Sequence, residues 1–134
     1  MSDERAVSRA IREVREAYEQ LMNAFADGDT DRYFACFHED SWFVFPGEPV
    51  LEPRSTYRSA WSRWRDEGIR FTDVVADDVR MRVFGETAVV THRIATTVTA
   101  RGKATVDRER ESIIFARTDG RWLAVHEHLS PEPV

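Results

Sequence analysis

The feature that most constrains this chain is the pattern around Asp119 and Gly120, close to its C-terminal end. Apolar and polar residues alternate on both sides of this pair, over residues 107–118 and 121–130. Asp-Gly is the strongest short-range signal for a hairpin, because both residues tolerate the positive φ that a tight turn requires. The pattern therefore predicts a long antiparallel hairpin. Its second strand ends in His126, Glu127 and His128, so titratable groups lie where an apolar strand would ordinarily continue.

The rest of the chain divides into a helical first part and a strand-rich second part. Apolar residues at spacings of three and four predict three helices, at about residues 2–26, 30–37 and 55–68. A short strand is expected at residues 42–45. Four long antiparallel strands follow, with turns predicted at Gly85-Glu86, Arg101-Gly102 and Asp119-Gly120. Helices followed by a run of strands predict one α+β domain over residues 1–134, with the helices packed on one face of an antiparallel sheet.

Composition excludes several classes of protein. The 134 residues suffice for one core but not for two, and the net charge of −5 argues against a nucleic-acid partner, which requires a basic face. Cys36 is the single cysteine, so no internal disulfide is expected. Because the sequence shows neither the apolar core of a signal peptide nor a membrane-spanning run, we expect a cytoplasmic protein with no membrane partner.

Strand pairing predicts which side chains face the core. A two-residue turn at Gly85-Glu86 places Val79, Met81 and Val83 beside His92, Val90 and Ala88 on an inner face. Carrying the pairing through Arg101-Gly102 and a three-residue bulged turn at Asp119-Gly120 adds Glu111 and Glu127 to the same face. The opposite face is then expected to carry Trp122, Ala124, His126 and His128. A turn of another length exchanges the two faces of the strand beyond it.

His92, Glu111 and Glu127 are the candidate catalytic residues, because they interrupt an otherwise apolar face on three neighbouring strands. Two carboxylates in a half-apolar pocket repel each other, so one is expected to hold its proton while a histidine nearby carries another, as general acid-base catalysis requires. The alternative is a buried polar network that only fixes the register of the sheet.

The aromatic residues in the middle of the chain follow strand and helix spacing. Core packing explains such a set, but the same side chains could also line a cavity for a small apolar or aromatic ligand: Phe43, Phe45, Tyr57 and Trp61. His126 and His128 are two residues apart on one strand and lack a third metal ligand, so we interpret them as interface residues rather than a metal site. No Gly-rich phosphate loop is present, and no cofactor is predicted.

Three segments of the chain resemble one superfamily: GDTDRYFACFHEDSWFVFPG, GETAVVTHRI and DGRWLAVHEHLSP. Together with the order of elements, they resemble the nuclear transport factor 2-like superfamily, and within it the SnoaL-like group and the association domain of calmodulin-dependent protein kinase. The resemblance implies a cone-shaped (cystatin-like), strongly curved sheet around a long N-terminal helix, with a pocket between them. It does not imply one activity, because this fold serves isomerases, dehydratases, cyclases, hydrolases and noncatalytic oligomerisation modules.

The chain departs from the best-known members of the superfamily. Steroid isomerases of this fold carry a general-base Asp where this chain has Phe45, and an oxyanion-binding Tyr where counting back from Gly28-Asp29 gives Leu21. The kinase association domain resembles the chain but has a pocket His at the position of Tyr57 and an Arg at that of Leu129. Neither established site is reproduced.

We therefore expect a small-molecule-binding SnoaL-like domain. If it is an enzyme, the expected chemistry is cofactor-independent isomerisation, dehydration or cyclisation of a small carbonyl compound. Glu127 or Glu111 is then the base, His92 the acid or an orienting group, and Tyr57 a hydrogen-bond donor. The alternative function is a noncatalytic dimerisation module with a vestigial pocket. In either case we expect a homodimer formed through the outer face of the sheet.

Overall fold

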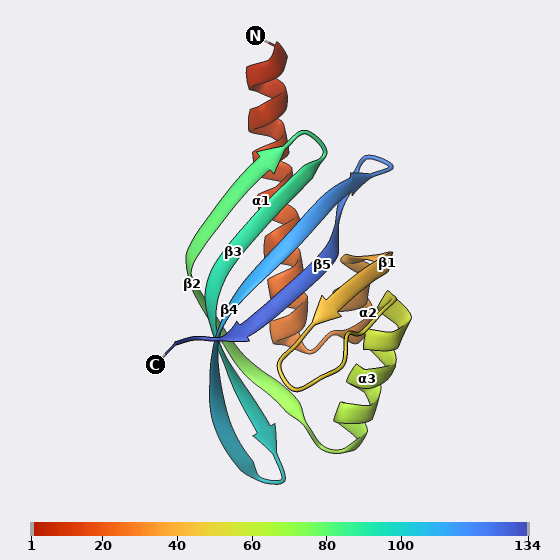
Figure 1. Cartoon of the computed structure of the whole chain (residues 1–134), viewed down its shortest axis with the longest axis vertical. Helices are drawn as coiled ribbons and strands as arrows, with labels where there is room; N and C mark the ends of the chain where they lie inside the picture. The colour runs from red at the N-terminus through yellow and green to blue at the C-terminus, as the bar shows by residue number, and fades with distance from the viewer. Residues whose placement is uncertain (1, 134) are drawn as a thin grey trace.

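The computed structural model describes residues 2–133 and consists of helices that line one face of a curved sheet (Figure 1). The elements in chain order are α1 (Ser2–Asp27), α2 (Thr30–Ala35), β1 (Phe37–Val44), α3 (Arg54–Asp66), β2 (Arg70–Phe84), β3 (Thr87–Ala100), β4 (Lys103–Thr118) and β5 (Arg121–Pro131). The five strands form one sheet in the order β1-β5-β4-β3-β2, with β1 parallel to β5 and the other neighbours antiparallel. The predicted α+β arrangement is confirmed. None of the helices in this part of the chain is long and apolar enough to cross a membrane.

Helix α1 crosses the concave face of the sheet and extends beyond it (Figure 1). Its C-terminal half packs on the sheet through buried residues at helical spacing: Val14, Tyr18, Leu21 and Ala24. Its first turns lie beyond the end of the sheet (Figure 1), and Val7 is correspondingly exposed. Gly28 has a φ of +67°, which ends the helix in a conformation that favours glycine. The Asp29 side chain then caps α2 by accepting from the backbone N–H of Arg32.

The boundary between α2 and β1 differs from the prediction. The short helix ends at Ala35 rather than Phe37, and the strand begins at Phe37 rather than residue 42. Phe37 is fully buried and pairs with Ala124 of β5. Because this pairing joins segments far apart in the sequence, a local pattern of aromatic residues could not reveal it.

The β2–β3 hairpin has the predicted two-residue turn, and Met81 pairs with Val90. The predicted pairing of Val79 with His92 is wrong. A bulge lies between Asp77 and Arg80, where Asp78 adopts a φ of +51°, and Val79 is 46% exposed. The extra residue in the bulge leaves Val79 without a partner on β3, so it is not paired with His92.

The β4–β5 hairpin also corrects the predicted register. Its turn has two residues, not three, because Thr118 pairs with Arg121. Trp122 and Ala124 therefore lie on the inner face, where both are buried, and not on the outer face. The extra residue occurs later, as a bulge at Val125 between the pairs Phe115–Ala124 and Ile114–His126. Beyond this bulge the predicted register is restored.

The core lies between α1, α2, α3 and the part of the inner sheet face nearest the β2–β3 and β4–β5 turns. Six of its side chains come from β3, β4 and β5: Ala88, Val90, Ile113, Phe115, Trp122 and Ala124. The helices add a cluster of aromatic rings, in which Tyr33 contacts Phe34, Phe37, Tyr57 and Trp61 with centroid separations of 5.0–6.0 Å. This packing fixes the helices relative to the sheet and leaves the other end of the inner face less covered.

Candidate functional site

The three titratable residues predicted for the inner face all lie there. His92 and Glu127 are 2% exposed and Glu111 is 7% exposed. His92 pairs directly with Glu111 across β3 and β4, while Glu127 pairs with Ile113 across β4 and β5. The bulge at Val125 is what returns Glu127 to the inner face after Trp122 and Ala124.

A relay of hydrogen bonds joins α1 to two strands. The Tyr18 hydroxyl oxygen lies 2.6 Å from His92 Nδ1, and His92 Nε2 lies 2.7 Å from Glu111 Oε1. Burial lowers the pKa of His92 to about 4, so its ring is neutral at neutral pH. Burial, reinforced by Glu109, raises the pKa of Glu111 to about 8. The contact is therefore mainly a hydrogen bond between neutral groups at neutral pH rather than an ion pair.

The relay has two proton arrangements. With Glu111 protonated, its O–H donates to Nε2 and the Nδ1–H of His92 donates to Tyr18. With Glu111 ionised, Nε2–H donates to the carboxylate and the Tyr18 hydroxyl donates to Nδ1. Burial and the nearby Glu111 raise the pKa of Tyr18 to about 12, so the hydroxyl keeps its proton in both arrangements. Loss of a proton from Glu111 thus changes the tautomer of His92 without charging the ring.

Glu127 lacks such a partner. Within residues 2–133 its buried carboxyl group takes part in no hydrogen bond or ion pair. Burial, followed by the charge of Glu111, raises its pKa well above the usual value for a carboxyl group. Burial thus favours the protonated form of this carboxyl group, which borders the space in front of it.

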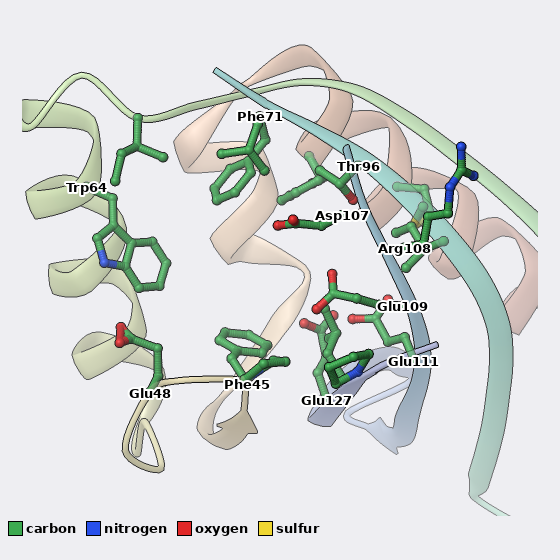
Figure 2. A pocket seen from close by; sticks show the side chains of 18 of the residues that line it. Phe45, Glu48, Trp64, Phe71, Thr96, Asp107, Arg108, Glu109, Glu111 and Glu127 are labelled. Carbon is green, nitrogen blue, oxygen red and sulfur yellow. The ribbon is translucent and has the colours of Figure 1, made fainter. Parts of the chain in front are cut away.

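That space is a cavity of about 610 Å³ at the less covered end of the sheet. Glu111 and Glu127 form part of its wall, together with apolar and aromatic side chains from the helices and the loop after β1. Figure 2 shows Phe45 and Trp64 on the side opposite the carboxyl groups of β4 and β5. A volume in this range accommodates a small organic molecule.

The four aromatic residues predicted to bind a ligand separate into two pairs. Tyr57 and Phe45 line the cavity, whereas Phe43 and Trp61 do not and belong to the core behind it. Tyr57 is buried, and its hydroxyl lies 2.9 Å from that of Tyr33, which also lines the cavity. Burial raises the pKa of both tyrosines well above 10, so each hydroxyl remains protonated and one of them is left to donate elsewhere.

His92 does not line the cavity either, although it contacts Glu111. It lies between Tyr18 and that carboxyl group and is separated from any occupant of the cavity. Its position supports an orienting role for Glu111 rather than direct proton donation to a ligand.

The structure adds polar residues to the site that the sequence did not predict, among them Asp107, Glu109 and Tyr18. Asp107 and Glu109 line the cavity on β4, two and four residues before Glu111. Strand alternation could have found them, since residues at this spacing share a face. Tyr18 follows the helical spacing of the buried residues of α1, Val14, Leu21 and Ala24. Nothing in the stripe distinguishes a tyrosine whose hydroxyl meets a histidine 74 residues later.

His126 and His128 lie on the outer face, with ring centroids 6.2 Å apart. His126 packs against Trp42, at a centroid separation of 4.4 Å, and its Nδ1 lies 2.9 Å from the Trp42 carbonyl oxygen. Among the described residues, no three His, Cys, Asp or Glu side chains form a group that could hold a metal ion. The two histidines thus contribute to packing at the edge of the outer face.

Comparison with known proteins identifies relatives by sequence profile and by fold. The profile of a family described as "SnoaL-like domain" matches residues 14–134. A search among curated proteins finds no match.

Solved structures with the same fold include proteins with different names. A ketosteroid isomerase-like protein from Erwinia carotovora atroseptica is 16% identical, with a TM-score of 0.79 over 92% of this chain and 96% of the other. A proposed dehydratase of the NTF2-like family from Streptomyces avermitilis is 19% identical, with a TM-score of 0.78 over 96% of this chain and 99% of the other. An NTF2-like protein from Rhodospirillum rubrum, of unknown function in nutrient uptake, is 24% identical, with a TM-score of 0.77 over 90% and 98%. At these identities the similarity establishes the fold, and the cone-shaped NTF2-like, cystatin-like architecture is confirmed.

Proposed function

This chain belongs to the SnoaL-like domain family, and from that premise we propose that it binds a small organic molecule and transfers protons on it without a cofactor. The observation that carries the proposal is the pair of buried carboxyl groups, Glu111 and Glu127, in the wall of an otherwise largely apolar cavity. Carboxyl groups in such surroundings hold protons near neutral pH, which is the property a general acid or base requires.

The two carboxyl groups suit different roles. Glu111, with a pKa of about 8, has both its protonated and ionised forms present near neutral pH, so it can accept a proton. Glu127, whose pKa is raised well above the usual value, favours its protonated form, and we assign it the role of proton donor. Tyr18 and His92 keep the Glu111 carboxyl group in one orientation and are positioning residues. A hydroxyl of the Tyr33–Tyr57 pair can donate to a carbonyl oxygen of the ligand.

Removal of a proton next to a carbonyl group and its return at another atom is common to isomerisation, dehydration and cyclisation. These are the reactions we propose for a small carbonyl compound. Support comes from the cavity and from the names of two neighbours, a ketosteroid isomerase-like protein and a proposed dehydratase.

Proton transfer can be tested before the substrate is identified. A set of cyclic and aromatic ketones is incubated with the protein in deuterated water, and loss of the proton signal next to the carbonyl group is followed by NMR. We expect exchange above the protein-free rate, and a fall of about a hundredfold or more when Glu111→Gln and Glu127→Gln are combined.

The matched control is Glu86→Gln, in the β2–β3 turn, which removes a carboxylate outside the cavity and leaves exchange unchanged. Exchange by the double variant at the wild-type rate would exclude both carboxyl groups from proton transfer.

We also infer that the protein forms a homodimer through the outer face of the sheet. Correction of the β4–β5 register removes Trp122 and Ala124 from this face but adds Leu123 and Val125, which lie beside Ile114 and are only half-buried. An apolar stripe of this kind is costly in water unless it is covered. Sedimentation should show a dimer at tens of micromolar, and Ile114→Glu should convert it to a monomer. A wild-type monomer at that concentration would contradict the inference.

A further inference from the structure

The charged side chains in the wall of the cavity are almost all acidic. Four come from the sheet, namely Asp107, Glu109, Glu111 and Glu127, and Glu48 comes from the loop after β1. In Figure 2 the four sheet carboxyl groups lie on one side of the cavity, across from Trp64 and Phe45. Such a wall repels an anionic ligand unless basic groups offset it.

Arg108 is the single basic residue of this wall within residues 2–133, and its guanidinium points away from the cavity (Figure 2). It also lines a separate groove with Asp77 and Glu132 on the other side of the sheet. Its neighbours in the sequence, Asp107 and Glu109, face the cavity because strand residues alternate between faces. Among residues 2–133, no basic side chain therefore points toward the carboxyl groups of the interior.

Glu127 is an independent indication that this wall can bind a polar group of a ligand. It is 2% exposed, borders the cavity and has no partner among the described side chains. Buried carboxyl groups are nearly always hydrogen-bonded or paired. A ligand that carries an ammonium group can pair with the ionised form of Glu127 and so stabilise that form.

The opposite wall favours the same class of ligand. Phe45, Trp64 and Phe71 line the cavity, and aromatic faces attract cations through their quadrupole. An inorganic ion is a poorer fit, since no three acidic or histidine side chains of the described chain form a metal-binding group. The volume of about 610 Å³ also fits an organic molecule.

We propose that this cavity binds an organic cation, in which a protonated amine or quaternary ammonium group is attached to an apolar or aromatic body. The ammonium group lies against Glu127 and Glu109, and the apolar body lies against the aromatic wall. The inference rests on the proposed ligand-binding function and specifies the charge of the ligand.

Binding of a cation is linked to protons. A positive charge beside Glu127 or Glu111 favours their ionised forms, so binding releases protons and its affinity rises with pH. The titratable or charged groups that face this region are Glu48, Asp107, Glu109, Glu111, Glu127, Tyr33 and Tyr57, with His92 and Tyr18 behind Glu111. The tyrosines and the neutral histidine do not titrate between about pH 6 and pH 8, so the carboxyl groups dominate the dependence.

The test compares three probes of similar size and different charge: 2-phenylethylamine, 2-phenylethanol and 3-phenylpropionate. Binding is measured by titration calorimetry near pH 8 and near pH 6. We expect the amine to bind about tenfold or more tightly than the alcohol near pH 8, with a smaller advantage near pH 6, and the carboxylate to bind most weakly.

Glu127→Gln keeps the shape of the side chain but cannot ionise beside a bound cation, so it should weaken the affinity for the amine about tenfold and leave the affinity for the alcohol unchanged. Glu109→Gln is a second variant at a half-buried position, which reports on the same wall should the first fail to fold. Glu86→Gln, outside the cavity, is the matched control and should alter none of the three affinities.

The outcomes separate the two proposals. Equal or tighter binding of the alcohol or the carboxylate would overturn the preference for a cation while supporting a ligand-binding cavity. Binding of none of the three by the wild-type protein would overturn both. If Glu86→Gln and Glu127→Gln lose amine affinity equally, the loss comes from the net charge of the protein and not from the cavity. That result would also overturn the preference for a cation at this site.

Discussion

The two ends of the inner sheet face follow the same alternation of residues but differ in what covers them. Near the β2–β3 and β4–β5 turns, α1 packs directly on the strands, and Ile113 and Phe115 are fully buried. Farther along β4, the inner positions are Glu111, Glu109 and Asp107, and they border a cavity. At the covered end the inner side chains pack against α1 and are apolar. At the other end they border a cavity, where carboxyl groups can be accommodated. One end thus supplies stability and the other supplies polar groups for binding.

The largest expected effect is at the covered end. Phe115→Ala removes a ring that is 0% exposed and leaves a void, so we expect a loss of about 3–5 kcal/mol in the free energy of unfolding. Urea denaturation followed by circular dichroism measures the change. A loss below about 1 kcal/mol would show that this end is not close-packed, and the contrast between the two ends would disappear.

At the cavity end, Glu111→Gln is expected to stabilise the protein. The folded pKa of about 8 lies above the ordinary value near 4.5, so ionisation costs the folded state nothing below about pH 4.5. The cost grows between these values and is complete above about pH 8. We therefore expect the variant to gain about 2 kcal/mol or more near pH 8.5 and little near pH 4.5. Thermal unfolding of both proteins across this range is the measurement, and a gain independent of pH would contradict the raised pKa.

Tyr18→Phe tests the link between the two ends, since Tyr18 belongs to α1 and its hydroxyl contacts His92. The substitution leaves His92 Nδ1 without its partner, so we expect a loss of about 1–2 kcal/mol. A positioning role further predicts a changed His92 tautomer, visible in ¹⁵N NMR spectra of the ring, and a shifted pH dependence of ligand binding. Unchanged ring shifts would show that the hydroxyl does not determine the proton arrangement of the relay.

The smallest effect is expected for Thr96→Val, which replaces a hydroxyl by a methyl group in the cavity wall on β3. The Thr96 hydroxyl makes no side-chain hydrogen bond within the described chain. The free energy of unfolding should change by about 0.5 kcal/mol or less. A large loss would indicate that the cavity end also depends on close packing.

The order of elements could be predicted because helical and strand spacing are local properties. The stripe of α1, the α3 helix and the three tight turns are all recognisable from neighbouring residues. The limits of β1 could not be recognised in this way, because its first residues form a strand only by pairing with β5. Long-range pairing overrides local propensity, and the residues next to Phe37 carry no local signal for the pairing with β5.

The candidate site illustrates how a register can be right for one residue and wrong for its neighbours. The sequence predicts one extra residue in the turn of the β4–β5 hairpin. The hairpin does contain one extra residue, but it lies at Val125 and not in the turn. Glu127 therefore faces inward as predicted, although Trp122 and Ala124 face the opposite way. The position of the bulge depends on which side chains pack in the core. Trp122 packs there, and its ring nitrogen donates to Glu13 of α1.

By itself, the sequence determined the α+β class, the positions of the turns, and the presence of His92, Glu111 and Glu127 on neighbouring strands. These follow from spacing, pairing and turn chemistry, which act over a few residues or across one hairpin. Only the tertiary structure decided where α1 leaves the sheet uncovered, and hence where the cavity lies. It also decided that His92 lies behind Glu111, that Tyr18 completes the relay, and that the Glu127 side chain has no hydrogen-bonding partner within residues 2–133. These properties depend on contacts between elements distant in the chain, for which local sequence carries no signal.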